Sequence, residues 1–348
     1  ARVLEVVEYS SLPVVGELRL RGRHPYVESV SPEYRGRIGL DEPPAVGEDG
    51  NTVAVRVTGE DRYGLTGIVT RVISARQGAA HAAETLLESH RVPREWPEGV
   101  ERAADKLPKQ VQPGRHRDRV SLVDVPLVTI DGETAKDFDD AVYAERVRGG
   151  WRLVVAIADV AHYVKPDSPL DRCAWERGNS VYLPDRVVPM LPEGLSNGLC
   201  SLRPHEPRLT LVCDMKVTER GNVTRFEFYE AVIRSWQRLT YNRVQEFLDA
   251  GALDVESEVQ ASLKELESVY HALREAREAR GALDFDSHEA VLELRDGHVA
   301  AIHPVTRKDA HRLIEEAMIA ANVCAARFLE DMERPALYRV HEPPDAEK

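Results

Sequence analysis

Alternating apolar and polar positions dominate the first 75 residues of the chain. Short runs of this kind, separated by Gly, Pro and Asp, are typical of β-strands joined by tight turns. The clearest runs cover residues 17–21, 52–57 and 67–72. Their close spacing predicts a small β-barrel or sandwich over residues 14–75. Residues 1–13 also begin with an alternating run, and we interpret them as the end of a preceding β domain.

The pattern becomes helical after residue 76. We interpret residues 76–115 as a linker that contains helices, one of them at 81–90, and basic residues. From residue 116 onward strands and long helices are mixed, which predicts an α+β fold with one larger domain over residues 116–348. Its expected hairpins lie at 141–158, 209–233 and around 296–297, its long helices at 256–280 and 310–332, and its other strands at 123–130 and 336–340.

One shorter helix carries sequence signals at both of its ends. Thr240 precedes residues 241–248 and is a residue type that caps helix N-termini. Gly251 follows them and suits the left-handed conformation in which many helices end. We therefore expect this helix to begin at Tyr241.

Composition and charge limit the classes of protein to which this chain can belong. Of the 348 residues, 43% are hydrophobic and 30% are charged, so the chain can bury a sizeable core. The net charge of −13 argues against a protein that coats nucleic acid with its whole surface. The charge is unevenly distributed, however. Residues 106–119 hold five basic residues and one acid, whereas residues 121–140 hold six acids and one lysine.

The chain has no run of about 18 apolar residues, so we expect no membrane-spanning helix. Its four cysteines, at positions 173, 200, 213 and 324, form no C-x-x-C pair. Isolated thiols are typical of a cytoplasmic protein without disulfides, and they exclude a cysteine-ligated zinc site. We therefore expect a cytoplasmic protein with no membrane partner.

A dense group of acids directly follows an apolar strand. Five of them fall within ten residues: Asp131, Glu133, Asp137, Asp139 and Asp140. Like charges this close raise one another's pKa unless a cation neutralises them. In an extended segment Asp137 and Asp139 share one face, and a turn at Gly132 would bring Asp131 and Asp140 together. Oxygen ligands without His or Cys suit Mg²⁺ or Mn²⁺, and carboxylate-bound Mg²⁺ supports phosphodiester hydrolysis.

Three other interpretations of this segment fit its residues less well. An EF-hand loop requires glycine where the chain has Lys136 and an oxygen ligand where it has Ala135. An acidic surface loop would not be flanked so closely by apolar runs on both sides. A phosphatase with an aspartyl nucleophile places its acids directly on the apolar run, whereas Asp137 and Asp139 follow Thr-Ala-Lys. A cation site at the edge of a core is therefore the stronger interpretation.

The segment T-I-D-G-E-T-A-K-D-F-D-D-A-V, residues 129–142, resembles the signature of the ribonuclease II / ribonuclease R family in its catalytic RNB domain. Further stretches resemble this family in the same order, at residues 155–164, 180–192, 195–202, 315–322 and 338–344. Residues 14–75 resemble more loosely the cold-shock-type OB domains that precede RNB domains. The resemblance implies a small OB-like, cold-shock-type β-barrel followed by an RNB domain of antiparallel sheet with packed helices.

For function, the resemblance implies metal-dependent, processive 3′→5′ hydrolysis of single-stranded RNA to nucleoside 5′-monophosphates, in RNA decay. The enzyme would be an exoribonuclease II-type phosphodiesterase, and we expect it to be a monomer. The resemblance places the metal at Asp131, Asp137, Asp139 and Asp140, with Mg²⁺ as the expected ion and Mn²⁺ as the alternative. Asp131 and Asp140 are the expected direct ligands. Asp137 and Asp139 are the expected catalytic residues, and the rate should depend most on Asp139.

RNA-binding residues are expected among aromatic and charged side chains, because every base offers a face for stacking. The aromatic residues with which the family holds the RNA 3′ end match Tyr182 and Phe285, and Tyr241 lies nearby. Glu315 matches an RNA-contacting position, although Glu316 beside it leaves the register open. Each aromatic also has a purely structural interpretation as a core residue.

Two further groups of polar residues have both a functional and a structural interpretation. Alternation places Arg19 and Arg21 on one face of the N-terminal domain, where we expect them to guide RNA, or simply to face solvent. Asp159 and His162 follow a strand near the acidic segment. We expect them to form a hydrogen-bonded structural pair.

Two other functions stay open from the sequence. The first is an RNA-binding protein with an RNB fold but no turnover. In the family the RNB domain continues beyond the segment that matches residues 341–344 and contributes a further basic residue to the active site, so we expect the chain to be incomplete at both ends. The second is a metallophosphoesterase that acts on another substrate, which the RNB-wide resemblance disfavours.

Overall fold

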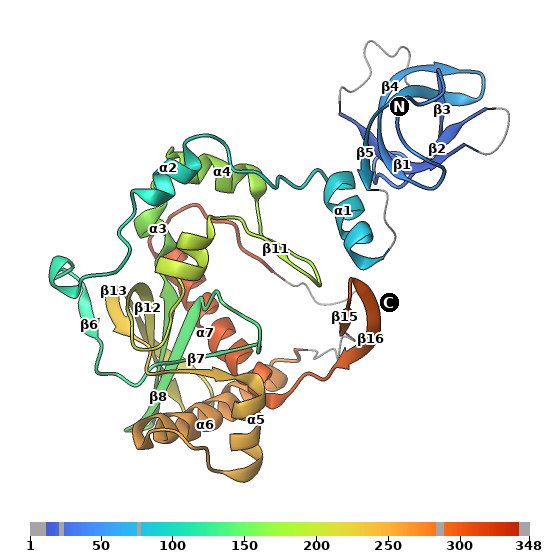
Figure 1. Cartoon of the computed structure of the whole chain (residues 1–348). Coiled ribbons are helices and arrows are strands. Elements are labelled where there is room, and N and C mark those ends of the chain that lie inside the picture. Colours follow the sequence, from blue (N-terminus) through green and yellow to red (C-terminus); the bar gives the residue numbers. More distant parts are fainter. Residues whose placement is uncertain (1–11, 21–23, 75–77, 283–288, 341–348) are drawn as a thin grey trace. The chain divides into compact units, whose positions relative to one another are not determined.

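The structure is a computed structural model, and it describes residues 12–20, 24–74, 78–282 and 289–340. The chain divides into two compact units (Figure 1). The first comprises residues 1–97, 173–190 and 289–305, and the second comprises the remainder. This division follows contacts through space, so the domain boundaries expected from the sequence stay a prediction. No helix in the described residues is long and apolar enough to cross a membrane.

The first unit contains a closed five-stranded barrel, shown in blue in Figure 1, with strand order β1-β2-β3-β5-β4. Its strands are β1 (Val14–Arg19), β2 (Tyr26–Ser29), β3 (Arg37–Leu40), β4 (Thr52–Asp61) and β5 (Gly64–Ser74). Its core contains Leu18, Val27, Ile38, Val53 and Val55. Closure leaves no strand edge unpaired. The expectation of an OB-like barrel is thereby confirmed.

Other elements of the first unit are short. They are α1 (Ala79–Ser89), the C-terminal part of α4 (Pro169–Arg177), the hairpin of β10 (Val181–Tyr182) and β11 (Val187–Val188), and the hairpin of β15 (Glu289–Arg295) and β16 (His298–Val305). Helix α1 begins two residues earlier than the pattern predicted. It ends with Arg91 in the left-handed region, at φ 54°, and the N–H of Val92 bonds to the carbonyl of Leu87 at 2.8 Å.

A seven-stranded sheet organises the second unit, with strand order β14-β7-β8-β9-β12-β13-β6. The strands are β6 (Val120–Leu122), β7 (Val128–Asp131), β8 (Asp140–Val147), β9 (Gly150–Ala158), β12 (Pro207–Thr218), β13 (Val223–Arg234) and β14 (Gln237–Thr240). The inner pairs are antiparallel, as expected, whereas the edge strands β6 and β14 pair in parallel with β13 and β7. The strand expected at 123–130 is split, because residues 123–127 form a turn between β6 and β7.

Helices α5 (Tyr241–Ala250), α6 (Ser257–Ala279) and α7 (Asp309–Asp331) pack on this sheet (Figure 1). They share one core with its strands, in which Leu153 and Met215 meet Phe247, Leu263 and Tyr270. The mixed α+β fold is confirmed. Shorter segments complete the unit: α2 (Val100–Asp105), η1 (Pro113–Arg115), α3 (Val160–Tyr163) and η2 (Gly194–Leu199). Residues 336–340 form no strand in the described part of the chain, which corrects the expectation drawn from their alternation.

The turn between β12 and β13 packs directly on α6. Gly221 lies in this turn with φ +70°, and a Cβ atom there would lie 2.0 Å from the carbonyl oxygen of Ala272. Only glycine satisfies both the backbone conformation and this close approach. The glycine therefore fixes how closely the long hairpin approaches the helix.

Candidate metal centre

The acidic segment begins where two parallel strands end together. In the register of β7 and β14, Asp131 is paired with Thr240. Thr240 also caps α5, since its hydroxyl accepts the N–H of Arg243 at 3.3 Å. Because a helix N-terminus carries partial positive charge, it favours carboxylates at this edge of the sheet.

Residues 132–139, here called the aspartate loop, are held in place by hydrogen bonds to a distant segment. The hydroxyl of Ser201 accepts the N–H of Phe138 at 3.1 Å and donates to the carbonyl of Lys136 at 2.7 Å. The N–H of Leu202 donates to the carbonyl of Phe138 at 2.8 Å. At the end of the loop, the N–H of Ala158 donates to the carbonyl of Asp139, also at 2.8 Å. The loop backbone is therefore fixed on both sides of Asp137.

Arg238 on β14 supports the beginning of the same loop. Its Nη2 donates to the carbonyl oxygens of Gly132 and Glu133, at 2.7 and 2.9 Å. The guanidinium also lies 5.6 Å from the ring centroid of Phe138. Its positive charge lowers the pKa of Asp131 and so opposes the other influences on that group. Arg238 thus joins the two ends of the aspartate loop and supplies a fixed cation.

The carboxylates nevertheless hold their protons unusually tightly. Burial, followed by the charge of Asp140, raises the pKa of Asp131 to about 7. Burial and the charge of Asp139 raise the pKa of Asp140 to about 6. Desolvation and the charge of Asp137 also raise the pKa of Asp139. The four aspartates predicted from the sequence are therefore brought close enough to repel one another.

Two carboxylate oxygens in this group are buried without a hydrogen-bond partner: Oδ2 of Asp131 and Oδ2 of Asp140. Buried acceptors of this kind are costly unless a donor or a cation satisfies them. Within the described residues, however, no group of three or more His, Cys, Asp or Glu side chains is arranged to hold a metal ion. The geometry thus offers a pair of oxygen donors rather than a closed cage.

Tyr241 lies beside this pair. Burial and the charges of Asp131 and Asp140 raise the pKa of its hydroxyl to about 12. Its ring stacks on His311 of α7, with the centroids 4.0 Å apart and the planes 18° from parallel. Tyr241 is thus both a neighbour of the carboxylates and partly packed against the core.

Glu315 and Glu316 differ sharply in their surroundings. The Glu315 side chain is 38% exposed and binds Arg307 at 2.5 Å. Glu316 is buried and binds Arg277 at 2.6 Å. Of the two, Glu315 therefore has the exposure that an RNA-contacting residue needs, while Glu316 fixes α7 to α6.

Other expected RNA-binding residues do not lie in this unit or are not described. Tyr182, on β10 of the first unit, is 66% exposed. Arg19, in the barrel, forms ion pairs with Glu17 at 2.8 Å and Glu28 at 3.8 Å. Phe285 and Arg21 lie outside the described residues. The RNA-binding roles of all four stay predictions.

Asp159 and His162 are hydrogen-bonded, with the N–H of His162 donating to Asp159 Oδ1 at 3.1 Å. The buried Arg119 joins them, since its Nη2 lies 2.6 Å from Asp159 Oδ2 and 3.2 Å from His162 Nδ1. Reasoning from sequence missed Arg119, Ser201 and Arg238. Ser201 lies in the family-like stretch 195–202, which was the available signal for it.

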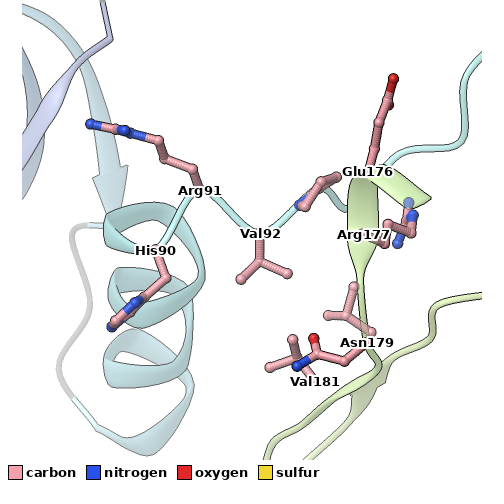
Figure 2. Close-up of a pocket in the computed structure, with 9 residues that line it drawn as sticks. His90, Arg91, Val92, Glu176, Arg177, Asn179 and Val181 are labelled. Carbon is pink, nitrogen blue, oxygen red and sulfur yellow. The ribbon is translucent and has the colours of Figure 1, made fainter. Parts of the chain in front are cut away.

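A cavity of about 240 Å³ lies in the first unit, between the segment after α1 and the β10 hairpin (Figure 2). Val92, Val181 and Val188 supply its apolar lining, and Asn179 its amide. Figure 2 shows the side chains of Arg91 and Glu176 extending outward. None of the aspartates lines this cavity, so it is separate from the carboxylate site.

Comparison with known proteins identifies the family to which the chain belongs. The family model described as the RNB domain matches residues 119–348. The chain is 42% identical to ribonuclease R of Vibrio parahaemolyticus over 99% of its length, and 47% identical to ribonuclease R of Escherichia coli over 82%. It spans only 42% and 36% of the lengths of these two relatives.

A solved structure of a ribonuclease R is also similar to this chain. Mycoplasma genitalium RNase R, in complex with double-stranded RNA, matches 96% of this chain with a TM-score of 0.86 and 27% sequence identity, and the match covers 60% of that protein. The aspartate loop and its supports lie within the matched RNB region. The chain belongs to the RNB-domain family and is similar in sequence and fold to ribonuclease R.

Proposed function

We propose that this chain is the catalytic part of a metal-dependent 3′→5′ exoribonuclease that degrades single-stranded RNA processively to nucleoside 5′-monophosphates. The observation that carries the proposal is the pair Asp131 and Asp140, each with a buried carboxylate oxygen that has no partner. Membership of the RNB family supports an RNA substrate. The relatives' name, ribonuclease R, supports hydrolysis rather than binding alone.

The donor set suits a hard divalent cation. Asp131 and Asp140 would hold it, with Asp137 and Asp139 nearby, and we propose Mg²⁺ with Mn²⁺ as the alternative. Mg²⁺ in proteins is commonly bound by one or two carboxylates and completed by water and substrate phosphate, which fits the absence of a three-residue cage among the described residues. A bound divalent ion would activate water and neutralise charge on the phosphate.

The protein's own residues prepare the site for this chemistry. Arg238 and Ser201 hold the aspartate loop so that its carboxylates need not be gathered when substrate arrives. Tyr241 offers an aromatic face beside Asp131 and Asp140. We assign Tyr241, Glu315 and Tyr182 to RNA binding, and Asp139 to the position that affects the rate most.

The deciding experiment uses RNA labelled at its 5′ end, with a single-stranded 3′ extension, in the presence of Mg²⁺. The longer parent protein, this chain and the Asp139→Asn variant of each are compared. Stepwise shortening from the 3′ end that disappears in the variant supports the proposal. Labelled mononucleotide appearing at the start of the reaction would instead indicate attack from the 5′ end.

The second candidate, an RNA-binding protein without turnover, is tested by the same reactions. It predicts that the parent protein retains RNA in a gel-shift assay without forming any product with Mg²⁺ or Mn²⁺. Activity of the parent but not of this chain would locate the missing contribution in the remaining length that the relatives possess. The expected monomeric state and cytoplasmic location are not addressed by this experiment and stay predictions.

A further inference from the structure

The stacked rings of Tyr241 and His311 join two helices at the carboxylate site. Tyr241 is the first residue of α5, and His311 lies in the first turn of α7. The two planes are within 18° of parallel, which is close to full face-to-face overlap for rings 4.0 Å apart. Tyr241 directly follows Thr240, which is paired with Asp131 in the register of β14 and β7, so the stack lies beside the candidate metal centre.

His311 is itself held by the backbone of its own helix. Its Nδ1 accepts the N–H of Lys308 at 3.1 Å, which closes the first turn of α7. A ring nitrogen that accepts a hydrogen bond carries no proton, so the neutral ring has its proton on Nε2. This hydrogen bond ties one edge of the His311 ring to the start of α7.

A polar chain runs parallel to the stack. The ammonium of Lys308 donates to Oδ1 of Asn242, the residue after Tyr241. The amide nitrogen of Asn242 donates to Oε1 of Glu133 in the aspartate loop, at 2.9 Å. The first turn of α7 thus contacts both the start of α5 and the loop that carries the acids. These two hydrogen bonds link α7, α5 and the aspartate loop to one another beside Tyr241.

We propose that His311 is a positioning residue, which fixes the plane of the Tyr241 ring so that this ring can stack on a base of the RNA held at the carboxylates. The inference deepens the proposed function and rests on it for the identity of the stacked ligand. The alternative is that the hydrophobic core alone orients Tyr241 and His311 merely packs against it.

Two substitutions separate the stacking of the His311 ring from its role as a hydrogen-bond acceptor. His311→Phe keeps a flat ring for stacking and loses the acceptor for the Lys308 N–H. His311→Gln keeps an acceptor and loses the ring. A matched control is His271→Gln, which removes an exposed histidine that contacts Tyr270 on α6, with centroids 4.8 Å apart and planes tilted by 41°. Thermal unfolding of all three variants establishes that they are folded.

The first measurement needs neither metal nor RNA. Fluorotyrosine incorporated at position 241 is observed by ¹⁹F NMR in the metal-free chain. If His311 positions the ring, the resonance broadens in His311→Gln, because the ring then samples more than one orientation, and stays narrow in His311→Phe and in His271→Gln. A shift without broadening reports only the loss of the neighbouring ring. A resonance that stays narrow in His311→Gln, or that broadens equally in His311→Phe, would overturn the inference.

The second measurement follows RNA shortening by the longer parent protein with the same variants. Loss of one base–aromatic stack should raise KM about tenfold in His311→Gln, with a smaller change in kcat and recovery in His311→Phe. A change of KM without the NMR broadening, or equal KM values in both variants, would also contradict positioning. If the unsubstituted parent does not shorten RNA at all, the proposed function fails, while the NMR result still decides the role of His311.

Discussion

Ser201 accepts a hydrogen bond from the backbone N–H of Phe138 at 3.1 Å, in an environment where the serine is completely buried. The same hydroxyl donates to the carbonyl of Lys136 at 2.7 Å, so one side chain bridges two backbone positions around Asp137. Arg208 holds Ser201 in turn, since its Nε donates to the Ser201 carbonyl at 2.7 Å. The geometry of the acids therefore depends on a residue more than sixty positions away in sequence.

Replacing Ser201 by alanine should lower the stability of the chain and weaken metal binding. The Phe138 N–H and the Lys136 carbonyl would lose their partner inside the protein, which typically costs about 1–3 kcal/mol of unfolding free energy. Urea unfolding measures this loss, and Mn²⁺ titration of the folded variant should show weaker binding. Ser268→Ala is the control, because that hydroxyl bonds to its own helix at an exposed position and its loss should change stability by less than about 0.5 kcal/mol. Equal effects of the two substitutions would contradict the bridging role.

The raised pKa values of the carboxylates predict an unusual dependence of stability on pH. Asp131 and Asp140 ionise near pH 7 and 6 in the folded chain but near 3.8 when unfolded, so the folded state binds protons more tightly. In the metal-free protein, the contribution of these two groups to stability should fall as pH rises from about 4 to about 7 and then level off. Thermal unfolding in EDTA at about pH 5 and about pH 8 tests this sign. Added Mg²⁺ should raise the Tm more at the higher pH, because the ion binds the ionised form.

The same reasoning predicts that a substitution in the site stabilises the metal-free protein. Asp140→Asn removes a buried charge next to Asp139 and Asp131, so it should raise the unfolding free energy above neutral pH by roughly 1–3 kcal/mol. It should also abolish the additional stabilisation by Mg²⁺. Asp105→Asn, on the exposed end of α2, is the comparison and should change neither quantity. Destabilisation of the metal-free chain by Asp140→Asn above neutral pH would contradict the electrostatic account.

The turn at Gly221 should tolerate no side chain. Gly221→Ala combines a left-handed backbone conformation with a Cβ placed 2.0 Å from the Ala272 carbonyl oxygen, and we expect a loss of about 3 kcal/mol or more. Gly149→Ala measures the cost of the left-handed backbone conformation alone. Gly149 also has a positive φ, +83°, but nothing lies within 4 Å of its Cβ position. That variant should lose only about 1 kcal/mol. Denaturant midpoints for the pair measure the difference, and similar losses would show that contact with α6 is unimportant.

The start of α5 offers a test of helix capping at the site. Thr240→Ala removes the acceptor for the Arg243 N–H and should cost about 1 kcal/mol of unfolding free energy. Thr240→Ser keeps the hydroxyl and should recover most of that stability. Circular dichroism during urea unfolding measures both variants. A serine variant as unstable as the alanine variant would indicate that the methyl group of this buried threonine, rather than its hydroxyl, is what matters.

Local features of this fold could be predicted from the sequence. The hairpin of β8 and β9 follows from alternation and two adjacent glycines, and α5 begins and ends where its capping residues indicate. The acids could be found because they are contiguous in sequence and follow an apolar strand. In each case the signal and the structure involve residues only a few positions apart.

Contacts between distant segments could not be predicted in this way. Arg238 reaches the Gly132 carbonyl across 106 positions, because β14 pairs in parallel with β7. A periodic pattern identifies a strand but does not identify its partner. The same limit explains residues 336–340, which alternate like a strand and form none in the described part of the chain. It also explains why Tyr241 could not be assigned from sequence to either the core or the site.

The parallel pairing of β7 with β14 also has a consequence for the order of assembly. During synthesis the acids of residues 131–140 emerge from the ribosome well before Arg238, because Arg238 is made 98 residues after Asp140. Until β14 has been made and has joined the sheet, the aspartate loop lacks Arg238, the α5 N-terminus and Tyr241. A nascent chain surrounded by ribosomal RNA therefore carries the acids of the site without its supports, and the centre is completed only after the sheet has formed.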